Sequence, residues 1–420
     1  MAVIFRTATV AGAGLAGLGA AVNLVRAGLT VRVADAAAHA GGRCRSYHDP
    51  KLGLTIDNGN HLVLAGNGAV ARFRVAVGAD TPLAGPDHAE FAFADLRDGA
   101  RWTIGLNDGP LPWWVLARHR RVPGTTAADY ARLAGLLTGR ADDTVGDRIR
   151  PAGPVWDKLF EPVLLAVLNT PPAQGSARLT MAVLRESLLR GGMASRPRVA
   201  EPSLAAAFID PALDWLASHH APVALGRRLR GLTFDDDRVT ALDWGAGPEP
   251  VAADEAVILA VPPWVARELV PDLKAPDTFH AIVNGHFAHV PPAGTPPMLG
   301  LLGGTAEWLF AFPDRISVTV SAADALVDGD REDLARRFWD DIQRAHGFSA
   351  PLPRWQIVKE KRATFSATPV QDALRPPAAT RWHNLFLAGD WTQTGLPATI
   401  EGALRSGETA ARLASGGRKR

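Results

Sequence analysis

The sequence has one cysteine, Cys44, among its 420 residues. Within this chain a disulfide and a CxxC metal site are both excluded, because each needs a second cysteine. Lys and Arg number 45 against 43 Asp and Glu, so no strong field favours nucleic acid. No run of 18 apolar residues predicts a transmembrane helix. We expect a cytoplasmic globular protein with no metal site and no nucleic-acid partner.

The N-terminal region has the pattern of a βαβ unit. An apolar run at Thr7–Ala11 predicts a buried strand, and the Ala-, Leu- and Val-rich segment Leu15–Ala27 predicts a helix that ends before Gly28. Leu29–Val33 predicts a second strand. The alternation of strand, helix and strand favours a Rossmann-like α/β fold.

The turn between the first strand and helix carries the motif G-x-G-x-x-G at Gly12, Gly14 and Gly17. The first glycine permits the tight turn, the second admits a pyrophosphate and the third allows close helix–strand packing. The helix start at Leu15 and Ala16 presents free amides to phosphate. An acidic residue follows the second strand, where a carboxylate can bind ribose, and it is Asp35. The motif predicts a dinucleotide without distinguishing NAD from FAD.

A second glycine segment narrows the choice of cofactor. Val10 to Arg45 ends in AGGRCR and resembles the flavin-containing amine oxidase and phytoene desaturase superfamily. The resemblance implies that Gly41, Gly42 and Arg43 lie along the FAD pyrophosphate, with Arg43 neutralising its charge. We interpret Cys44 as a small packed residue rather than a flavin attachment point.

The segment from Leu385 to Gly407, LFLAGDWTQTGLPATIEGALRSG, is similar to the C-terminal flavin segment of that superfamily. The resemblance places Gly389 and Asp390 near the ribitol or pyrophosphate. It also implies that amides at Thr399 and Ile400 begin a helix aimed at the flavin ring. Leu229 matches a position whose backbone contacts adenine in relatives.

The sequence DNGNH at Asp57–His61, the run KEKRAT at Lys359–Thr364 and the C-terminal segment resemble one subgroup, the hydroxysqualene dehydroxylases. These are also called squalene-associated FAD-dependent desaturases. The resemblance implies an FAD-dependent oxidoreductase that uses reduced FAD to convert hydroxysqualene to squalene in squalene and hopanoid synthesis. Its partner would be a C30 isoprenoid lipid, and other squalene-pathway enzymes are further candidate partners.

Loss of hydroxide from an allylic alcohol requires an acid. The candidates are His61, Asp57 and Lys361. His61 is our first choice, because imidazole titrates near neutrality. Each has a structural alternative: a hydrogen-bonded histidine, a loop anchor and a solvated strand residue.

A hydrocarbon substrate implies that the protein reaches a bilayer. In DGPLPWWVLARHRRVP, residues 108–123, Trp113 and Trp114 precede the basic run Arg118–Arg121. Interfacial tryptophan and arginines near anionic headgroups are typical of peripheral attachment, so we expect contact with the inner face of the cell membrane. The alternative is a core tryptophan pair beside a solvated basic turn.

The prediction for the whole chain is a discontinuous Rossmann-like FAD-binding domain, residues 1–75, 215–275 and 370–420. An inserted α+β substrate-binding domain would comprise residues 76–214 and 276–369. Two other functions stay open: a phytoene-type desaturase, which transfers hydride from a polyprenyl lipid to FAD, and a non-catalytic FAD-binding scaffold subunit. An amine oxidase is disfavoured, because Thr399 stands where those enzymes place an aromatic side chain.

Overall fold

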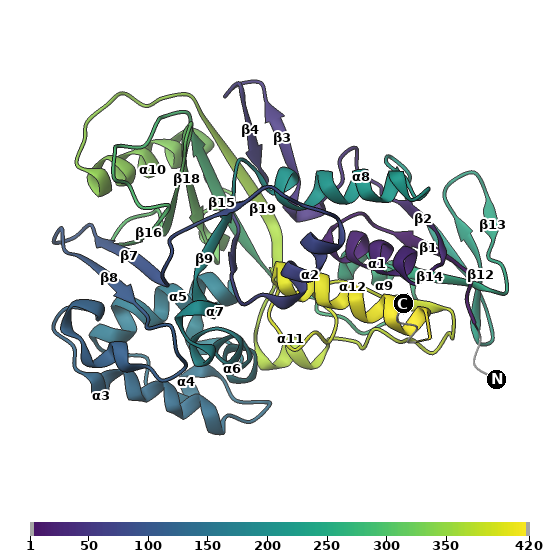
Figure 1. Ribbon diagram of the computed structural model, residues 1–420, viewed down its shortest axis with the longest axis horizontal. Coiled ribbons are helices and arrows are strands. Elements are labelled where there is room, and N and C mark those ends of the chain that lie inside the picture. Colours follow the sequence, from purple (N-terminus) through teal and green to yellow (C-terminus); the bar gives the residue numbers. More distant parts are fainter. Residues whose placement is uncertain (1–3, 417–420) are drawn as a thin grey trace.

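The structure is a computed structural model that describes residues 4–416. A five-stranded parallel sheet forms one end of the elongated molecule (Figure 1). Its strands are, in spatial order, β10 (Val223–Ala224), β2 (Thr30–Ala34), β1 (Thr7–Ala11), β14 (Glu255–Leu259) and β20 (Leu385–Leu387). The first and last thirds of the chain therefore share one sheet, which closes the Rossmann-like fold.

Two helices from opposite ends of the chain lie side by side on this sheet, α1 (Leu15–Arg26) and α12 (Ile400–Ala414). Glycine lets them approach closely, because a Cβ at Gly407 would overlap the carbonyl oxygen of Ala16. Further helices of this half are α2 (Gly68–Ala76), α8 (Asp210–Ser218) and α9 (Pro263–Leu269). The close contact of α1 and α12 joins the two chain ends into one core.

The other face of the five-stranded sheet packs against α9 and an antiparallel meander. The meander consists of β11 (Gly231–Asp235), β12 (Arg238–Asp243) and β13 (Pro248–Pro250). Alternate residues of β14 point to opposite faces of the five-stranded sheet. Ile258 packs toward α1, and Val257 packs toward the meander. This strand is fully buried, as its continuous apolar sequence predicts.

A seven-stranded sheet forms the second half of the molecule. Its strands are, in spatial order, β19 (Trp355–Phe365), β15 (Phe279–Phe287), β18 (Arg315–Val320), β17 (Trp308–Phe312), β16 (Met298–Leu302), β7 (Glu90–Asp95) and β8 (Arg101–Gly105). Helix α10 (Arg331–His346) covers one face through Leu334, Phe338 and Ile342. We call the opposite face, which bears Trp308 and Phe310, the inner face.

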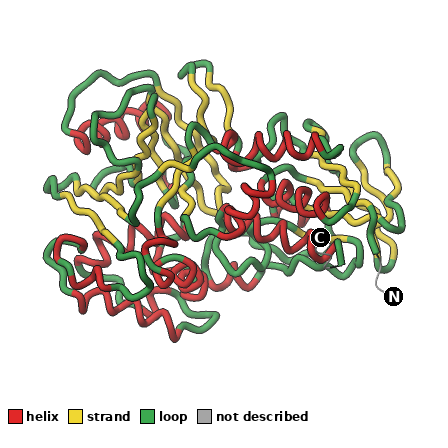
Figure 2. The backbone as a smooth tube through the Cα atoms, viewed as in Figure 1, coloured by secondary structure: helices red, strands yellow, loops and turns green. Residues whose placement is uncertain are grey.

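A helical layer packs on part of the inner face, and Figure 2 shows it as the red segments at the lower left. Its helices are α3 (Ala127–Tyr130), α4 (Val145–Arg148), α5 (Glu161–Leu168), α6 (Ala177–Glu186) and α7 (Gly192–Ser195). Smaller elements connect the halves: β3 (Ser46–Asp49), β4 (Leu54–Asp57), β5 (Leu62–Leu64), β6 (Leu83–Ala84), β9 (Pro197–Ala200) and α11 (Pro369–Ala373). Within residues 4–416, no helix combines the length and apolar composition needed to cross a membrane.

The α/β class predicted from the sequence is confirmed, and several elements match closely. β1 has the predicted bounds, and α1 begins at the predicted Leu15 and ends one residue before the predicted Ala27. The sequence pattern did not reveal β7, β8, β16 or β17. In β16 and β17 both faces are buried, so the alternation of polar and apolar residues that marks a half-exposed strand is weak.

Candidate functional site

The turn after β1 carries the first glycine motif. Gly12 has a φ of 113° and redirects the chain toward α1. A Cβ at Gly17 would overlap the carbonyl oxygen of Gly12, so helix and strand require glycine there. A Cβ at Gly14 would meet no atom within 4 Å. The turn therefore has open space at the position where the motif predicts a pyrophosphate.

The second glycine segment lies along this turn. Gly41 forms a parallel β-bridge with Gly14, and its amide donates to the carbonyl oxygen of Ala13 at 2.8 Å. The α-carbon of Gly14 would be 3.4 Å from a Cβ at Gly42. Two stretches of backbone without side chains are thus side by side, beside the N-terminus of α1.

Asp35 occupies the corner after β2. Its carboxylate accepts hydrogen bonds from the amides of Ala13 at 2.6 Å and Ala37 at 2.7 Å. Asp35 therefore shapes the glycine turn as well as offering oxygens toward a ribose. The amide of Arg227 donates to the carbonyl oxygen of Asp35 at 2.8 Å, so the loop leading to Leu229 adjoins this corner.

An ion pair joins the glycine segment to the C-terminal segment. Arg43 Nη2 donates to Asp390 Oδ1 at 2.7 Å, and Arg43 Nη1 donates to the carbonyl oxygen of Ala363 at 2.6 Å. The Asp390 side chain is buried, whereas the Arg43 side chain is 42% exposed. The Arg43 side chain therefore stays partly accessible to an anion.

The segment after Asp390 is held by buried contacts. Arg375 Nη2 donates to the carbonyl oxygen of Asp390 at 3.0 Å, and the amide of Gly389 donates to Ser406 Oγ at 2.8 Å. Thr399 caps α12, because its Oγ1 accepts the amide of Gly402 at 3.0 Å. Ile400 is then the first residue of α12. These contacts hold the N-terminus of α12 in place, which is the helix start expected to point at the flavin ring.

We call residues 12–17, 35, 41–43 and 389–390 the cradle. An FAD pyrophosphate fits it, since open space at Gly14, a helix N-terminus and an accessible guanidinium meet there. Asp35 supplies acceptor oxygens at the ribose end. All predicted dinucleotide residues except Leu229, Thr399 and Ile400 belong to this group; those three lie on elements that adjoin it.

Asp57 is tied into the protein interior. Its Oδ1 accepts the hydroxyl of Ser46 at 2.5 Å and the amide of Leu204 at 2.9 Å. Burial raises the pKa of Asp57, while these hydrogen bonds oppose the shift. The contacts describe a loop anchor between β3, β4 and the segment that leads to α8.

His61 lies behind the glycine segment. Its Nδ1 is 2.8 Å from the carbonyl oxygen of Gly59, and its Nε2 is 3.9 Å from Cys44 Sγ. Because a carbonyl oxygen only accepts, Nδ1 carries the proton and Nε2 is an acceptor. Burial lowers the pKa of His61 and raises that of Cys44 to about 12. His61 is therefore neutral at physiological pH, with no proton on the nitrogen that faces the thiol.

The structure places Lys361 away from the cradle. Its side chain is 67% exposed and pairs with Asp328 at 2.7 Å on the α10 side of the large sheet. The adjacent Glu360 lies on the inner face, where its Oε2 accepts Asn58 Nδ2 at 3.2 Å. Lys361 is thus the solvated strand residue that the sequence offered as the alternative to an acid, and strand alternation places its neighbour Glu360 on the opposite face of β19.

A chain of amide and hydroxyl groups links the loop at 58–61 to the large sheet. Asn60 Nδ2 donates to Thr319 Oγ1 at 3.1 Å, and that hydroxyl donates to Asn284 Oδ1 at 2.8 Å. Asn60 Oδ1 is buried and has no hydrogen-bond partner among the described residues. Since buried acceptors are normally paired, this oxygen is available to a ligand or to water.

The segment 108–123 is divided between surface and core. Trp113 is 63% exposed, whereas Trp114 is 6% exposed and packs edge-on against Tyr130, with ring centroids 5.2 Å apart. The expectation that both tryptophans face an interface is thus wrong for Trp114, which the helical core requires. Leu111 and Leu116 are exposed beside Trp113, and Arg118 and Arg120 are also exposed.

Residues 15–414 match the family model described as flavin containing amine oxidoreductase. The chain is similar to hydroxysqualene dehydroxylases of several bacteria. That of Rhodopseudomonas palustris is 52% identical over 97% of this chain and 98% of its own length. That of Zymomonas mobilis is 49% identical over 96% of this chain and 97% of its own.

Solved structures with low sequence identity share the fold. A putative protoporphyrinogen oxidase from Exiguobacterium superposes with a TM-score of 0.71, at 19% identity, over 98% of this chain and 99% of its own. At this identity the similarity concerns architecture alone. It agrees with the two-sheet architecture described above.

Proposed function

Because this chain belongs to the hydroxysqualene dehydroxylases, within the flavin-containing amine oxidoreductases, we propose that it removes the hydroxyl group of hydroxysqualene to give squalene. The chain is an FAD-dependent oxidoreductase. The observation that carries the proposal is the 52% sequence identity between this chain and its Rhodopseudomonas palustris relative over nearly the full length of both. The cradle, which fits FAD, agrees with it.

The overall reaction exchanges a C–O bond for a C–H bond: the alcohol gains a hydride at carbon and a proton at oxygen, and water leaves. Bound FAD in its reduced form supplies the hydride. Arg43 and the start of α1 would neutralise the pyrophosphate, and Asp35 would accept hydrogen bonds from the ribose hydroxyls. Asp390 fixes the guanidinium of Arg43 for this task.

The three predicted acids receive different roles in this proposal. His61 positions the loop at 58–61 beside the cradle, because its Nδ1 is committed to Gly59 and its Nε2 lacks a proton. Asp57 anchors the same loop through Ser46. Lys361 forms an ion pair with Asp328 on the surface of the large sheet.

The proposed domain division follows the two sheets. Residues 1–75, 215–275 and 370–420 would form the FAD-binding domain, since their strands build the five-stranded sheet and the meander. Residues 76–214 and 276–369 would bind substrate, since they supply the large sheet and the helical layer. The first three and last four residues lie outside the described part of the chain.

We also propose peripheral contact with an anionic membrane on the cytoplasmic side. Leu111, Trp113 and Leu116 are exposed on the segment 108–123, and exposed Met193 follows Gly192, whose amide donates to the carbonyl oxygen of Asn107 at 2.8 Å. Arg118 and Arg120 flank them. An apolar projection beside basic residues suits headgroups and the outer acyl region, where an isoprenoid lipid would be collected.

An anaerobic assay tests the main proposal. The purified yellow protein is reduced and given hydroxysqualene, and the products are identified by mass spectrometry. We expect squalene. Conversion of phytoene by the oxidised protein, with hydroxysqualene unchanged, would favour the desaturase alternative. Full FAD occupancy without turnover of either lipid would favour a scaffold subunit.

A further inference from the structure

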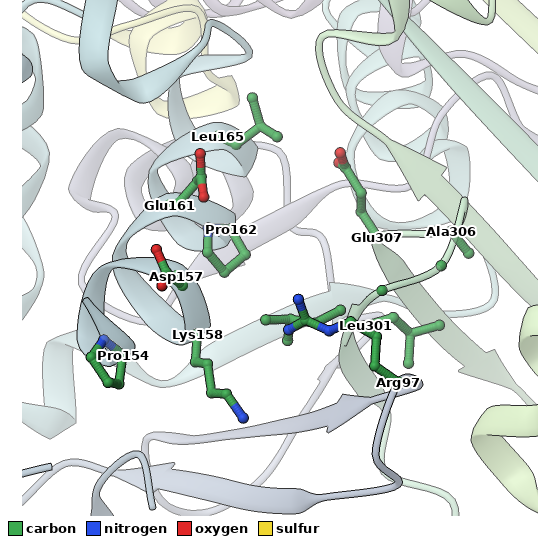
Figure 3. Close-up of a pocket in the computed structure, with 13 residues that line it drawn as sticks. Arg97, Pro154, Asp157, Lys158, Glu161, Pro162, Leu165, Leu301, Ala306 and Glu307 are labelled. Carbon is green, nitrogen blue, oxygen red and sulfur yellow. The ribbon is translucent and has the colours of Figure 1, made fainter. Parts of the chain in front are cut away.

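A cavity of about 580 Å³ lies between the helical layer and the large sheet. One wall is α5 with the π-helical turn before it, and the other is the end of β16 with the turn that leads to β17 (Figure 3). The lining residues are Arg97, Pro154, Asp157, Lys158, Glu161, Pro162, Leu165, Leu301, Leu302, Gly303, Gly304, Ala306 and Glu307. The cavity therefore opens beside the inner face of the substrate-binding half.

The mouth and the floor of the cavity differ in polarity. Asp157, Glu161 and Arg97 are exposed at the mouth, whereas Leu301, Leu302 and Ala306 are buried at the floor. Figure 3 shows Glu161 and Glu307 on opposite walls. The lining thus combines five charged side chains with an apolar floor, and the floor beside Glu307 suits the hydroxyl-bearing segment of a hydrocarbon.

Glu307 is the titratable group at the floor. Its Oε2 accepts the amide of Ser321 at 2.7 Å, and it forms no ion pair with any described residue. Burial raises the pKa of Glu307 to about 7, while the Ser321 amide opposes the shift. A carboxyl group with such a pKa carries its proton in a substantial fraction of molecules near neutral pH, as a general acid requires.

Other charged groups around Glu307 come from three directions. α5 and the preceding turn contribute Glu161, Asp157 and Lys158, and the β7–β8 turn contributes Arg97. Lys158 is 3.4 Å from Asp95, so its charge is directed to that carboxylate. On the α10 side, Asp341 Oδ2 accepts the amides of Thr305 and Ala306. These contacts leave the Glu307 carboxyl without a neutralising cation.

The end of β18 connects the cavity to the loop beside the cradle. Thr319 bonds Asn60, and Ser321 bonds Glu307. Thr319 and Ser321 are two residues apart, which is about 7 Å along a strand.

A second path begins at the next residue, Ala322, whose amide donates to Asn169 Oδ1 at 2.6 Å. Asn169 Nδ2 in turn donates to Thr364 Oγ1 at 2.9 Å, next to the Ala363 carbonyl that holds Arg43. These contacts form a continuous path from the cavity floor to the carbonyl group that holds Arg43.

We propose that this cavity receives the hydroxyl-bearing segment of the isoprenoid alcohol and that Glu307 is the catalytic acid that protonates the departing oxygen. This inference rests on the proposed function. The Glu307 proton passes to the hydroxyl oxygen as the C–O bond breaks, and water leaves with both electrons of that bond. The carbon takes the hydride that reduced FAD supplies. The Glu307 carboxylate then recovers a proton from solvent at the mouth.

The test compares E307Q with wild type in anaerobic turnover of hydroxysqualene. Glutamine keeps the size and the hydrogen-bonding capacity but has no acidic proton. We expect kcat to fall by about 100-fold or more with KM within a few-fold, since removing a general acid costs about that much. The matched control is E332Q on exposed α10, which should keep wild-type kcat. For wild type, kcat should decline as pH rises through about 7.

Infrared spectroscopy gives a readout independent of turnover. At pH 6 the oxidised wild type should show the C=O band of a protonated carboxyl, which is absent in E307Q and shifts when hydroxysqualene is added. E307D should restore part of the activity, which separates loss of the acid from misfolding. Wild-type kcat and pH profile in E307Q would overturn the proposal. A wild-type protein that does not convert hydroxysqualene would contradict the proposed function instead. If the C=O band of that protein also did not shift when hydroxysqualene was added, the role of Glu307 would be overturned as well.

Discussion

The guanidinium of Arg43 bonds the carboxylate of Asp390 at 2.7 Å, although 347 residues separate them in the chain. This contact closes the cradle, because Arg43 belongs to the glycine segment and Asp390 follows the last strand. The carboxylate is buried and the guanidinium is partly open. The orientation of Arg43 toward a pyrophosphate therefore depends on Asp390.

Replacing Asp390 with alanine should weaken FAD binding. A hydrogen bond to a charged group contributes about 1.5–3 kcal/mol, so D390A should raise the dissociation constant of FAD by about tenfold to a hundredfold. Titration of the apoprotein, followed by flavin fluorescence, measures this constant. D328A, at the exposed partner of Lys361, is the control and should bind FAD as wild type does. Equal affinity of D390A and wild type would contradict the role of the ion pair.

Two glycines of the same motif should respond differently to substitution. A Cβ at Gly14 meets open space, so G14V should fold and lose FAD. A Cβ at Gly17 would overlap the Gly12 carbonyl, so G17V should be destabilised even without cofactor. Thermal unfolding of both apoproteins, with FAD titration, checks the pair. If G14V bound FAD normally, the pyrophosphate would not lie beside Gly14.

His61→Ala should leave the protein yellow but slow. The side chain positions the 58–61 loop through Gly59 and contributes nothing to the dinucleotide turn. Because burial lowers its pKa, wild-type His61 should be neutral at physiological pH. Nitrogen NMR of the imidazole should find the proton on Nδ1. A colourless H61A protein would instead assign the residue to folding of the cradle.

Glu307 should make the stability of the apoprotein depend on pH. Its folded-state pKa of about 7 lies above the ordinary glutamate value of 4.5, so the folded state binds the proton more tightly than the unfolded state does. The stability contributed below pH 4.5 is lost as pH rises to 7, by about 3 kcal/mol at most. Urea unfolding of wild type and E307Q at pH 5 and pH 8 measures the difference. The free energy of unfolding of wild type should fall relative to E307Q over this interval, and a constant difference would contradict the raised pKa.

The membrane proposal predicts lipid selectivity. W113E combined with R118E should abolish sedimentation with phosphatidylglycerol vesicles and leave FAD content unchanged. V75E, which alters another exposed apolar residue, should bind vesicles as wild type does. Binding of wild type should weaken at high salt, because the arginine contribution is electrostatic. If the double variant bound vesicles as wild type does, membrane contact through Trp113 and Arg118 would be contradicted.

The cradle was predictable because its chemistry demands particular residues at short spacing. Gly12, Gly14 and Gly17 define a turn whose backbone geometry few other residues permit. The resemblance at Gly41–Arg43 and Gly389–Asp390 added the cofactor. These features are local in sequence, so their meaning does not depend on which distant segments pack against them.

The substrate side was not predictable in the same way. Glu307 stands alone in TAEWLF, and only the fold reveals that its side chain lines a cavity. Lys361 and Glu360 differ in role because they face opposite sides of β19. The sequence pattern predicts an interfacial Trp114, whereas in the fold its ring packs edge-on against Tyr130. In each case the deciding contact joins segments that the sequence pattern does not relate.

The most direct test of the account is an anaerobic single turnover. Enzyme carrying reduced FAD is mixed with hydroxysqualene, and the return of the oxidised flavin absorbance is measured beside the squalene formed. The account predicts one equivalent of squalene for each FAD reoxidised. Flavin that stays reduced while hydroxysqualene stays unchanged would contradict it.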